Sequence, residues 1–343
     1  MAEITPYLQD VQRISSENLP WEKLAGCNIL ITGATGLIGG CLVDVLMNHP
    51  SCTCRVYALG RHEERARKRF ACYWNNDLFH FIQGDISKPL QQDTTFDYIV
   101  HAASNASPNF FKDKPVEVMK ANLQGMVNLM EYGLSHQMRR MLYVSSGEVY
   151  GEGSGEPFKE TDSGYVDCAT SRACYPSSKR ASETLAVSYA EEYGADVVIA
   201  RPCHTYGPYF TESDNRVYAQ FIRNVLRGED IVLKSPGSQY RSWLYVVDCA
   251  RALFYILLKG ESSQAYNVAD EASNATIRQL AEITAHVGNR KVIFDVNHPE
   301  ANSTPIQKAL FSTQKLQSLG WKPFFNLESG LYNTITTIET QTN

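Results

Sequence analysis

The chain has 343 residues, a formal net charge of -5 and 20% charged residues. A chain of this length can bury a large core. Because basic residues are not in excess over acidic ones, nucleic acid is not an expected partner. Nine cysteines without a Cys-x-x-Cys pair argue against a disulfide framework and a zinc site, so we expect no metal, reduced thiols and a cytoplasmic location. No apolar run approaches the roughly 18 residues that cross a bilayer, so a membrane is not an expected partner either.

Residues 1–24 precede the first predicted strand and are expected to form an added arm. Tyr7, Leu8 and the run 11–14 place apolar side chains at helical spacing. This spacing predicts a helix within the arm.

Short runs rich in branched apolar residues recur along the chain and are typical of buried strands. They lie at residues 28–32, 55–59, 79–83, 98–101, 141–145 and 197–201. Longer segments with helical periodicity separate most of them. This alternation predicts an α/β fold, with a Rossmann-type doubly wound parallel sheet and crossover helices.

A turn-rich segment at 206–209 follows the last of these strands and predicts entry into a different region. Apolar segments at 246–258 and 265–268 are then expected to return to the sheet. The sequence therefore predicts two interleaved domains. They are a dinucleotide-binding Rossmann domain at 25–200 plus 246–268 and a smaller C-terminal substrate-binding lobe at 201–245 plus 269–343.

A glycine-rich turn follows the first predicted strand. Gly33, Gly36 and Gly39 have the spacing Gly-x-x-Gly-x-x-Gly, and an apolar helical segment follows them as far as Met47. Glycines permit a tight turn and a close approach of the backbone to a pyrophosphate, and the helix N-terminus offers N–H donors and the positive end of its dipole. Strand, turn and helix together predict a dinucleotide-binding site.

The second predicted strand runs into Gly60 and Arg61, with no acid at its end. An acid there binds the ribose hydroxyls of NAD, whereas an arginine suits the 2′-phosphate of NADP. We therefore expect NADP or NAD as the cofactor, with a lean towards NADP. The alternative is that Arg61 stacks on adenine or faces solvent, as part of a basic cluster at 61–69 that otherwise resembles a solvated helix face.

Tyr175 and Lys179 lie four residues apart, so a helix places them on one face. Pro176 is tolerated in the first turn of a helix and puts Tyr175 near its start. A cation beside a phenol favours the phenolate, so we expect the usual pKa near about 10 to fall towards neutrality and make Tyr175 a base. The alternative is an ordinary surface pair.

Together with these two motifs, the segment 145–151 resembles the extended short-chain dehydrogenase/reductase family, in particular the NAD-dependent epimerases and dehydratases that act on nucleotide sugars. The similarity runs from about residue 27 to about residue 319. Its densest parts look like UDP-glucuronate decarboxylases and lie at 101–108, 120–122, 172–175 and 237–241. The resemblance implies a nucleotide-sugar substrate and a homodimer formed through a helix bundle.

The resemblance also implies a catalytic triad. Ser146 matches the residue that hydrogen-bonds the sugar hydroxyl, Tyr175 the acid–base group, and Lys179 the lysine that also holds the nicotinamide ribose. Ser146 follows the fifth predicted strand, at the sheet edge where ligands bind, although a capping hydroxyl is common at the same place.

Glu148 separates the reactions of this family. Its 4-epimerases usually carry a neutral residue there, so a carboxylate implies chemistry at C5 of the sugar. In 4,6-dehydratases an aspartate precedes it, whereas Gly147 stands here. In decarboxylases a matching glutamate acts with an arginine, matched by Arg241, on the C6 carboxylate and the C5 centre. A plain diphosphate clamp is the alternative role for Arg241.

Further contacts follow from the resemblance. The implied cofactor-binding residues are Gly33, Thr35, Gly36, Leu37, Ile38, Gly39, Arg61, Asp85, Ile86, Ala102, Ala103, Tyr175 and Lys179. The implied substrate-binding residues are Ser107, Asn122, His204, Arg216 and Arg241. His204 and Tyr209 replace an asparagine and an arginine that are common in the segment lining the diphosphate, so the sugar stays open.

The chain is therefore expected to oxidise C4 of a nucleotide sugar and to act at C5, with UDP-glucuronate decarboxylase as the nearest resemblance. Alternatives within the class are a 4-epimerase, a 4,6-dehydratase and an NADPH-dependent keto-sugar reductase. A regulator that senses NAD(P)H without catalysis is a different class, and the intact Ser146, Tyr175 and Lys179 argue against it.

Overall fold

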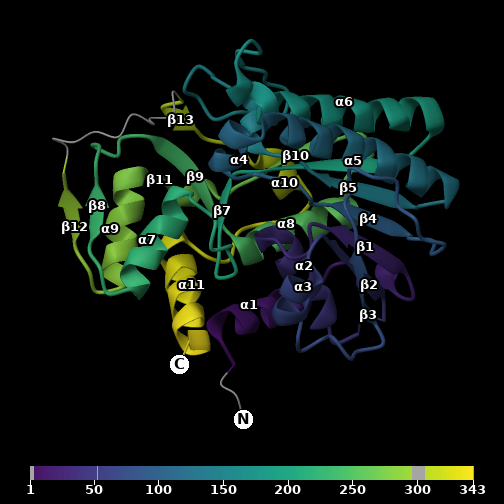
Figure 1. Ribbon diagram of the computed structural model, residues 1–343, viewed down its shortest axis with the longest axis horizontal. Helices are drawn as coiled ribbons and strands as arrows, with labels where there is room; N and C mark the ends of the chain where they lie inside the picture. Colours follow the sequence, from purple (N-terminus) through teal and green to yellow (C-terminus); the bar gives the residue numbers. More distant parts are fainter. Residues whose placement is uncertain (1–3, 52, 296–305, 343) are drawn as a thin grey trace.

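The computed structural model describes residues 4–51, 53–295 and 306–342 and has a seven-stranded parallel sheet at its centre (Figure 1). The strands are β1 Asn28–Thr32, β2 Arg55–Gly60, β3 Phe79–Gln83, β4 Tyr98–His101, β5 Arg140–Val144, β6 Val197–Pro202 and β10 Ala265–Val268. Their order in the sheet is β10-β6-β5-β4-β1-β2-β3. The order changes direction between β1 and β4, and doubly wound sheets bind their ligands at such a switch point.

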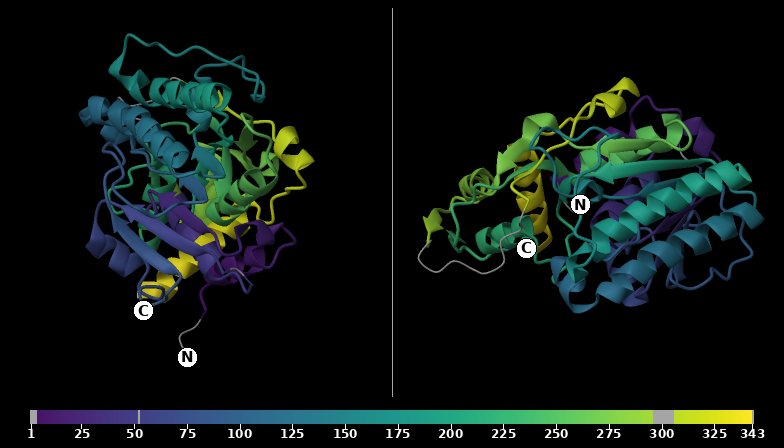
Figure 2. Two further views of the ribbon diagram at one scale, coloured as in Figure 1. Left: turned by 90° about the vertical axis from the view of Figure 1, so that its right-hand side faces the viewer. Right: turned by 90° about the horizontal axis from the view of Figure 1, so that it is seen from above.

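Helices cover both faces of the sheet. One face carries α5 Pro115–Ser135 and α6 Cys174–Tyr193, and the other carries α2 Leu37–Met47, α3 Glu63–Arg69 and α8 Val246–Lys259 (Figures 1 and 2). Successive residues of β1 serve opposite faces: Ile29 and Ile31 join the core with α2 and α8, whereas Leu30 joins the core with α5 and α6. Burial on both faces explains why this strand is a continuous apolar run.

A smaller lobe lies beside the large sheet, on the left of Figure 1. One of its sheets contains β7 His204–Tyr206, β9 Tyr240–Tyr245, β11 Asn274–Thr276 and β13 Lys308–Ala309, and the other pairs β8 Ile231–Leu233 with β12 Val292–Phe294. Its helices are α7 Val217–Leu226, α9 Ile277–Val287 and α11 Leu327–Thr342, while the short α10 Gln314–Ser318 packs on β10 of the large sheet. Two separate stretches of chain therefore build the lobe.

The predicted parallel sheet is confirmed. All six strands predicted from the sequence are present within one residue of the expected bounds, and the chain returns to the sheet through α8 and β10. Residues 1–3, 296–305 and 343, which belong to the predicted arm and the predicted substrate lobe, lie outside the described residues. Within the described ranges, none of the helices is both apolar enough and long enough to span a bilayer.

The N-terminal arm contains the expected helix, α1 (Pro6–Ser15), which Thr5 caps with its side chain. α1 packs against α2, α8 and α11. The Tyr7 hydroxyl donates to the Asp44 carboxylate of α2 at 2.5 Å, and Asp44 also pairs with Arg69 of α3. The arm is therefore bonded to the helix that follows the glycine turn.

Asp10 is a buried acid in this arm. Its Oδ2 accepts hydrogen bonds from the Tyr245 hydroxyl at 3.1 Å and from the Asn333 amide at 2.7 Å, which join α1 to β9 and α11. Burial raises the pKa of Asp10 to about 6, and the two hydrogen bonds oppose this effect only in part.

We predict that Asp10→Asn stabilises the protein more at neutral pH than in acid. Because the folded pKa lies above the unfolded one, ionised Asp10 costs stability above about pH 6, and the cost disappears below about pH 4, where the carboxyl is protonated in both states. An asparagine keeps an acceptor oxygen and buries no charge. In thermal unfolding, the advantage of the variant over the native protein should grow as the pH rises through this window. An advantage that is independent of pH would contradict this account of Asp10.

Candidate active site

The glycine turn lies at the switch point of the sheet, after β1. Gly33 has a φ of +66°, and a Cβ on it would lie 2.7 Å from the Cα of Ala103 and 2.9 Å from the Ala102 oxygen. A Cβ on Gly39 would lie 2.5 Å from the Gly33 oxygen, so the turn itself requires both glycines. A Cβ on Gly36 would meet only the Gly33 oxygen, at 3.1 Å. The backbone at Gly36 is therefore the part of the turn that a ligand can approach.

The first turn of α2 points backbone donors towards this approach. Gly36 is the N-cap, and the N–H groups of Leu37 and Ile38 have no helical carbonyl before them to bond. Such donors and the helix dipole suit a pyrophosphate, with Thr35 inside the turn. These residues fit a dinucleotide in the way the sequence predicts.

Two arginines lie where β2 ends. Arg61 is exposed and donates to Asn105 Oδ1 at 3.3 Å, while Arg65 donates to the carbonyl oxygen of Thr35 at 2.9 Å. Burial and, after it, the charge of Arg61 lower the pKa of Arg65, so the two guanidinium groups repel each other. In the described part of the chain neither forms an ion pair with a carboxylate. The end of β2 is therefore positively charged.

Asp85 and Ile86 follow β3. Asp85 Oδ1 accepts from the Ser87 N–H at 3.0 Å and from the Ser87 hydroxyl at 2.9 Å, and the backbone bond is the main reason why the pKa of Asp85 is lowered. The Ile86 side chain packs on Gly125 of α5. The contact of both residues with adenine stays a prediction.

Tyr175 lies in the first turn of α6 and is 5% exposed. Its ring stacks on Phe111 of α4 (Pro108–Asp113), with ring centres 4.7 Å apart and an angle of 23° between the planes. Lys179 follows one turn later, with its Nζ 5.8 Å from the centre of the Tyr175 ring. That ammonium donates to the carbonyl oxygen of Val144, the last residue of β5, at 2.8 Å. The helix thus brings phenol and ammonium to the edge of the sheet that carries the glycine turn.

The electrostatics of this pair differ from the prediction. Burial raises the pKa of Tyr175 to about 12, and the negative charge of Glu148 adds to the rise, against a hydrogen bond with Ser146. Burial likewise lowers the pKa of Lys179 to about 7. The expectation that Lys179 brings the pKa of Tyr175 towards neutrality is therefore wrong for the protein groups alone, because desolvation disfavours both charged forms. A phenolate at neutral pH requires a further positive charge beside the ring.

Ser146 follows β5 and lies beside both Glu148 and Tyr175. Its Oγ accepts from the Glu148 N–H at 3.2 Å, which caps the 3₁₀ helix Gly147–Tyr150, and it is close enough to the Tyr175 phenol to oppose the rise in the pKa of that phenol. The capping role and the role implied by the resemblance are therefore compatible.

Gly147 lies against the ring of Phe311, which comes from the segment after β13. A Cβ on Gly147 would lie 2.4 Å from the Phe311 Cζ. Phe311 is 2% exposed, and backbone hydrogen bonds of 2.9 Å join Phe158 to both of its neighbours, Leu310 and Ser312. The ring therefore occupies the space that an aspartate would need before Glu148.

Arg241 of β9 is a buried cation, 5% exposed, and no described carboxylate forms an ion pair with it. It donates to the carbonyl oxygens of Tyr240 and Gln307, each at 3.0 Å, and to that of Ile306. Since a guanidinium has five N–H donors, two are left. Burial lowers the pKa of Arg241, and the charge of Glu148 opposes this. The arrangement suits a carboxylate or a diphosphate bound through two oxygens.

His204 and Arg216 lie near Arg241. His204 opens β7 beside Trp243, and its Nδ1 is buried with no hydrogen-bond partner among the described residues. Burial, followed by the charges of Arg241 and Arg216, lowers the pKa of His204 to about 3. Arg216 itself pairs with Asp214 at 2.5 Å. A neutral imidazole and two arginines therefore converge here.

Two implied substrate residues have other partners. Asn122 is fully buried, where it accepts from the Ser104 hydroxyl and donates to the Ser178 hydroxyl, both at 2.8 Å. It supports the first turn of α6 from beneath, and its contact with a sugar stays a prediction. Ser107 donates to Asn215 Oδ1 at 3.1 Å, which links the start of α4 to the lobe.

Tyr209, at the arginine position of the resembling segment, contacts the chain ends. The guanidinium of Arg69 lies 3.9 Å from its ring centre, the Tyr7 ring lies 5.1 Å away, and its hydroxyl accepts from Gln341 at 2.5 Å. Tyr209 therefore contributes to the anchoring of α1 and α11.

Three residues that lie at the site were not predicted from the sequence: Ser104, Phe111 and Phe311. Ser104 stands inside the motif 101–108, which was a usable signal. Phe111 and Phe311 reach the site only through the fold, and their local sequence carries no such signal.

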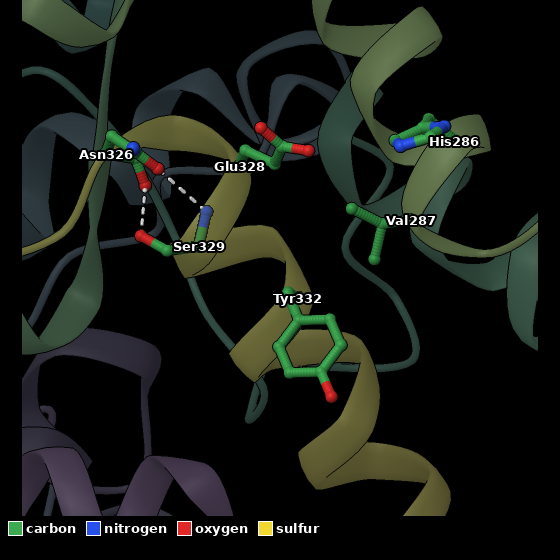
Figure 3. Close-up of a pocket in the computed structure, with 6 residues that line it drawn as sticks. All are labelled: His286, Val287, Asn326, Glu328, Ser329 and Tyr332. Atoms are coloured by element: carbon green, nitrogen blue, oxygen red, sulfur yellow. Dashed lines mark hydrogen bonds between the residues drawn. The ribbon is translucent and has the colours of Figure 1, made fainter.

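A cavity of about 470 Å³ lies between the end of α9 and the start of α11 and is separate from these residues (Figure 3). It is lined by His286, Val287, Asn326, Glu328, Ser329 and Tyr332. Asn326 accepts from the Ser329 N–H at 2.9 Å and from its hydroxyl at 3.1 Å, which caps α11. Asn326 and Ser329 thus use polar groups of this cavity to cap the helix.

Comparison with known proteins shows the family of this chain. Residues 29–269 match the model of the NAD dependent epimerase/dehydratase family. The chain is 33% identical to UDP-glucuronic acid decarboxylase 5 of Arabidopsis thaliana over 306 residues. This alignment covers 88% of this chain and 86% of the relative.

Solved structures share the fold. UDP-glucose 4-epimerase of Thermotoga maritima aligns with a TM-score of 0.79 at 23% identity, over 92% of this chain and 100% of that one. A dTDP-glucose 4,6-dehydratase of Bacillus anthracis, in complex with NAD, aligns with a TM-score of 0.77 at 22% identity, over 91% of this chain and 96% of that chain.

We predict that Tyr175→Phe lowers turnover by about 10² to 10⁴, the range for removal of a positioned acid–base group. The ring and its stacking on Phe111 are kept, so folding and dinucleotide binding should stay native. Tyr193→Phe, at the exposed end of the same helix, is the control and should be active. Single-turnover absorbance of the reduced cofactor measures the step directly. A native rate in Tyr175→Phe would remove Tyr175 from the chemistry.

Proposed function

Because the chain belongs to the NAD dependent epimerase/dehydratase family, we propose that it converts UDP-glucuronate to UDP-xylose, or to the corresponding 4-keto pentose. The reaction oxidises C4 and then releases the C6 carboxyl as carbon dioxide. The observation that carries this proposal is Arg241, a buried cation with two spare donors beside Glu148. The relatives named UDP-glucuronic acid decarboxylase support it.

The first step oxidises C4. When bound, the oxidised nicotinamide supplies the acceptor for the hydride that leaves this carbon, together with the positive charge that Tyr175 lacks. Tyr175 takes the proton of the C4 hydroxyl while Ser146 holds that hydroxyl. Lys179, with its Nζ 5.8 Å from the centre of the Tyr175 ring, adds positive charge beside the phenol when protonated, and we expect it also to bind the nicotinamide ribose. That charge would lower the pKa of Tyr175 from about 12, so that its phenolate could form and accept the proton.

The second step acts at C5. A ketone at C4 turns the C6 carboxylate into that of a β-keto acid. The C5–C6 bond then breaks, carbon dioxide leaves, and the bonding electrons pass into an enolate across C4 and C5. Glu148 conveys the proton that C5 takes up, and Arg241 binds paired anionic oxygens. Tyr175 would return its proton to the C4 oxygen as the reduced cofactor supplied the hydride to C4, which would give UDP-xylose. Release of the sugar nucleotide before that step would give the 4-keto pentose.

Packing disfavours one of the alternative reactions, and charge favours another. Phe311 occupies the side-chain space at Gly147, so loss of water from C6 lacks its expected acid. Arg61 and Arg65 favour a keto-sugar reductase as the second candidate, because such an enzyme uses NADPH. Convergence of Tyr175 and Lys179 on one helix face argues against a silent sensor.

The proposal includes a homodimer in the cytoplasm. On α5, Val116 is 63% exposed and Met119 is 38% exposed, and outward apolar side chains of this kind suit a helix-bundle interface. Free thiols among the described residues, including the exposed Cys72 and Cys168, suit a reducing compartment. The partners are a nucleotide sugar and a second copy of the chain.

We predict that the purified protein, supplied with cofactor, removes carbon dioxide from UDP-glucuronate. Mass spectrometry should detect a product that has lost the carboxyl carbon. Unchanged UDP-glucuronate, or a product inverted at C4 with all six sugar carbons, would contradict the decarboxylase proposal.

Glu148→Gln separates the two steps of this reaction. The amide is isosteric but cannot deliver the same proton, so C4 oxidation should proceed and the C5 step should slow. Reduced cofactor should therefore accumulate in the variant.

We predict that Arg61→Ala weakens NADP binding far more than NAD binding, since only NADP carries the extra phosphate. The family description and the NAD-bound neighbour support NAD itself as a cofactor, and Arg61 with Arg65 supports the preference for NADP. Titration of both dinucleotides measures the preference. Arg67→Ala, in an exposed pair with Glu63, is the control and should bind both as the native protein does. Equal losses for the two dinucleotides in Arg61→Ala would show that Arg61 does not bind the phosphate.

A further inference from the structure

Arg172 is a charged residue at the site, and the two proposed steps assign no role to it. Its Nη2 donates to Glu148 Oε2 at 2.9 Å. Its guanidinium carbon lies 5.0 Å from the ring centre of Phe111, the residue on which Tyr175 also stacks. One aromatic ring therefore contacts both the tyrosine and the arginine that binds Glu148.

The platform under Arg172 is fixed. Phe111 is 2% exposed and packs with Val118, Cys174 and Tyr175 in a small core of its own. Arg172 itself lies in the 3₁₀ helix Ser171–Ala173, which leads directly into α6. The backbone and the side chain of Arg172 are thus both held from the Tyr175 side.

Glu148 has charged neighbours on more than one side. It lies close enough to Tyr175 to raise the pKa of that phenol, and close enough to Arg241 to stabilise that cation. Arg172 is the cation that lies within hydrogen-bonding distance of the Glu148 carboxylate among the described residues. Without that bond, Arg241 or solvent competes for the carboxylate.

We propose that Arg172 is a positioning residue for Glu148, which holds this carboxylate in line with C5 by means of the Phe111 platform. The inference rests on the proposed C5 chemistry and assigns to Arg172 a role in the second step only. The side chains of Arg172 and Glu148 are 50% and 34% exposed, and ion pairs as open as this contribute little to folding. A purely structural role therefore predicts a small effect on both steps.

The test compares Arg172→Met and Arg172→Lys in the native and the Glu148→Gln backgrounds, with UDP-glucuronate and cofactor in single turnover. Arg172→Met should oxidise C4 at the native rate but prolong the reduced-cofactor absorbance about 10²-fold, the loss typical of a misplaced catalytic group. Arg172→Lys should restore part of the second rate. In the Glu148→Gln background, Arg172→Met should add no further slowing.

Arg278→Met is the matched control. Arg278 pairs with Glu282 at 2.8 Å, with side chains 56% and 45% exposed, in α9 of the lobe. It should leave both steps unchanged. Equal slowing of the two steps by Arg172→Met, or the same slowing with and without Glu148, would overturn the positioning role.

A crystal structure of Arg172→Met gives a readout that is independent of the substrate. The Glu148 carboxylate should leave its native position, and an unmoved carboxylate would overturn the inference. If the native protein leaves UDP-glucuronate unchanged, the proposed function fails, and this structural comparison still decides the role of Arg172. If decarboxylation occurs but the Arg172 variants behave as the native protein does, the inference alone fails.

Discussion

Desolvation governs the active site. Tyr175, Lys179 and Arg241 are each at most 5% exposed, and burial is the main influence on the pKa of each, always towards the neutral form. A protein keeps such groups only where hydrogen bonds support them, as the Val144 carbonyl supports Lys179. The positive nicotinamide and the anionic sugar nucleotide would supply the charges that the protein leaves uncompensated. Electrostatic stabilisation prepared in this way does not need solvent to reorganise during the reaction.

The parts of the site that could be predicted from the sequence have local signals. A strand, three spaced glycines and an apolar helix follow one another within the segment 28–47, so the cofactor turn needs no knowledge of the rest of the chain. Tyr175 and Lys179 are one helical turn apart, which is also a local relation. The sheet was predictable for the same reason, because burial on both faces makes each strand a continuous apolar run.

The parts that could not be predicted depend on contacts between distant residues. The pKa of Tyr175 is raised, against the expectation, because the fold buries the phenol and places the charge of Glu148 near it. The ring of Phe111, from another helix, is one of the groups that pack on Tyr175. Asparagine is a common ligand-binding residue type, but the side chain of Asn122 is buried and its polar atoms form hydrogen bonds with Ser104 and Ser178. Helical spacing places a residue on a face, and only the fold decides what covers that face.

The segment 306–312 closes the sugar side of the site from both ends. Its first carbonyls hold Arg241, and Phe311 lies on Gly147. Translation delivers this segment last among the parts of the site, long after the glycine turn and α6 have left the ribosome. A nascent chain therefore contains its glycine turn and α6 before the sugar side of the site can close. A product truncated before residue 306 would lack two of the carbonyl groups that hold Arg241 and the ring that lies on Gly147, and it would also lack α10, which packs on β10 of the large sheet.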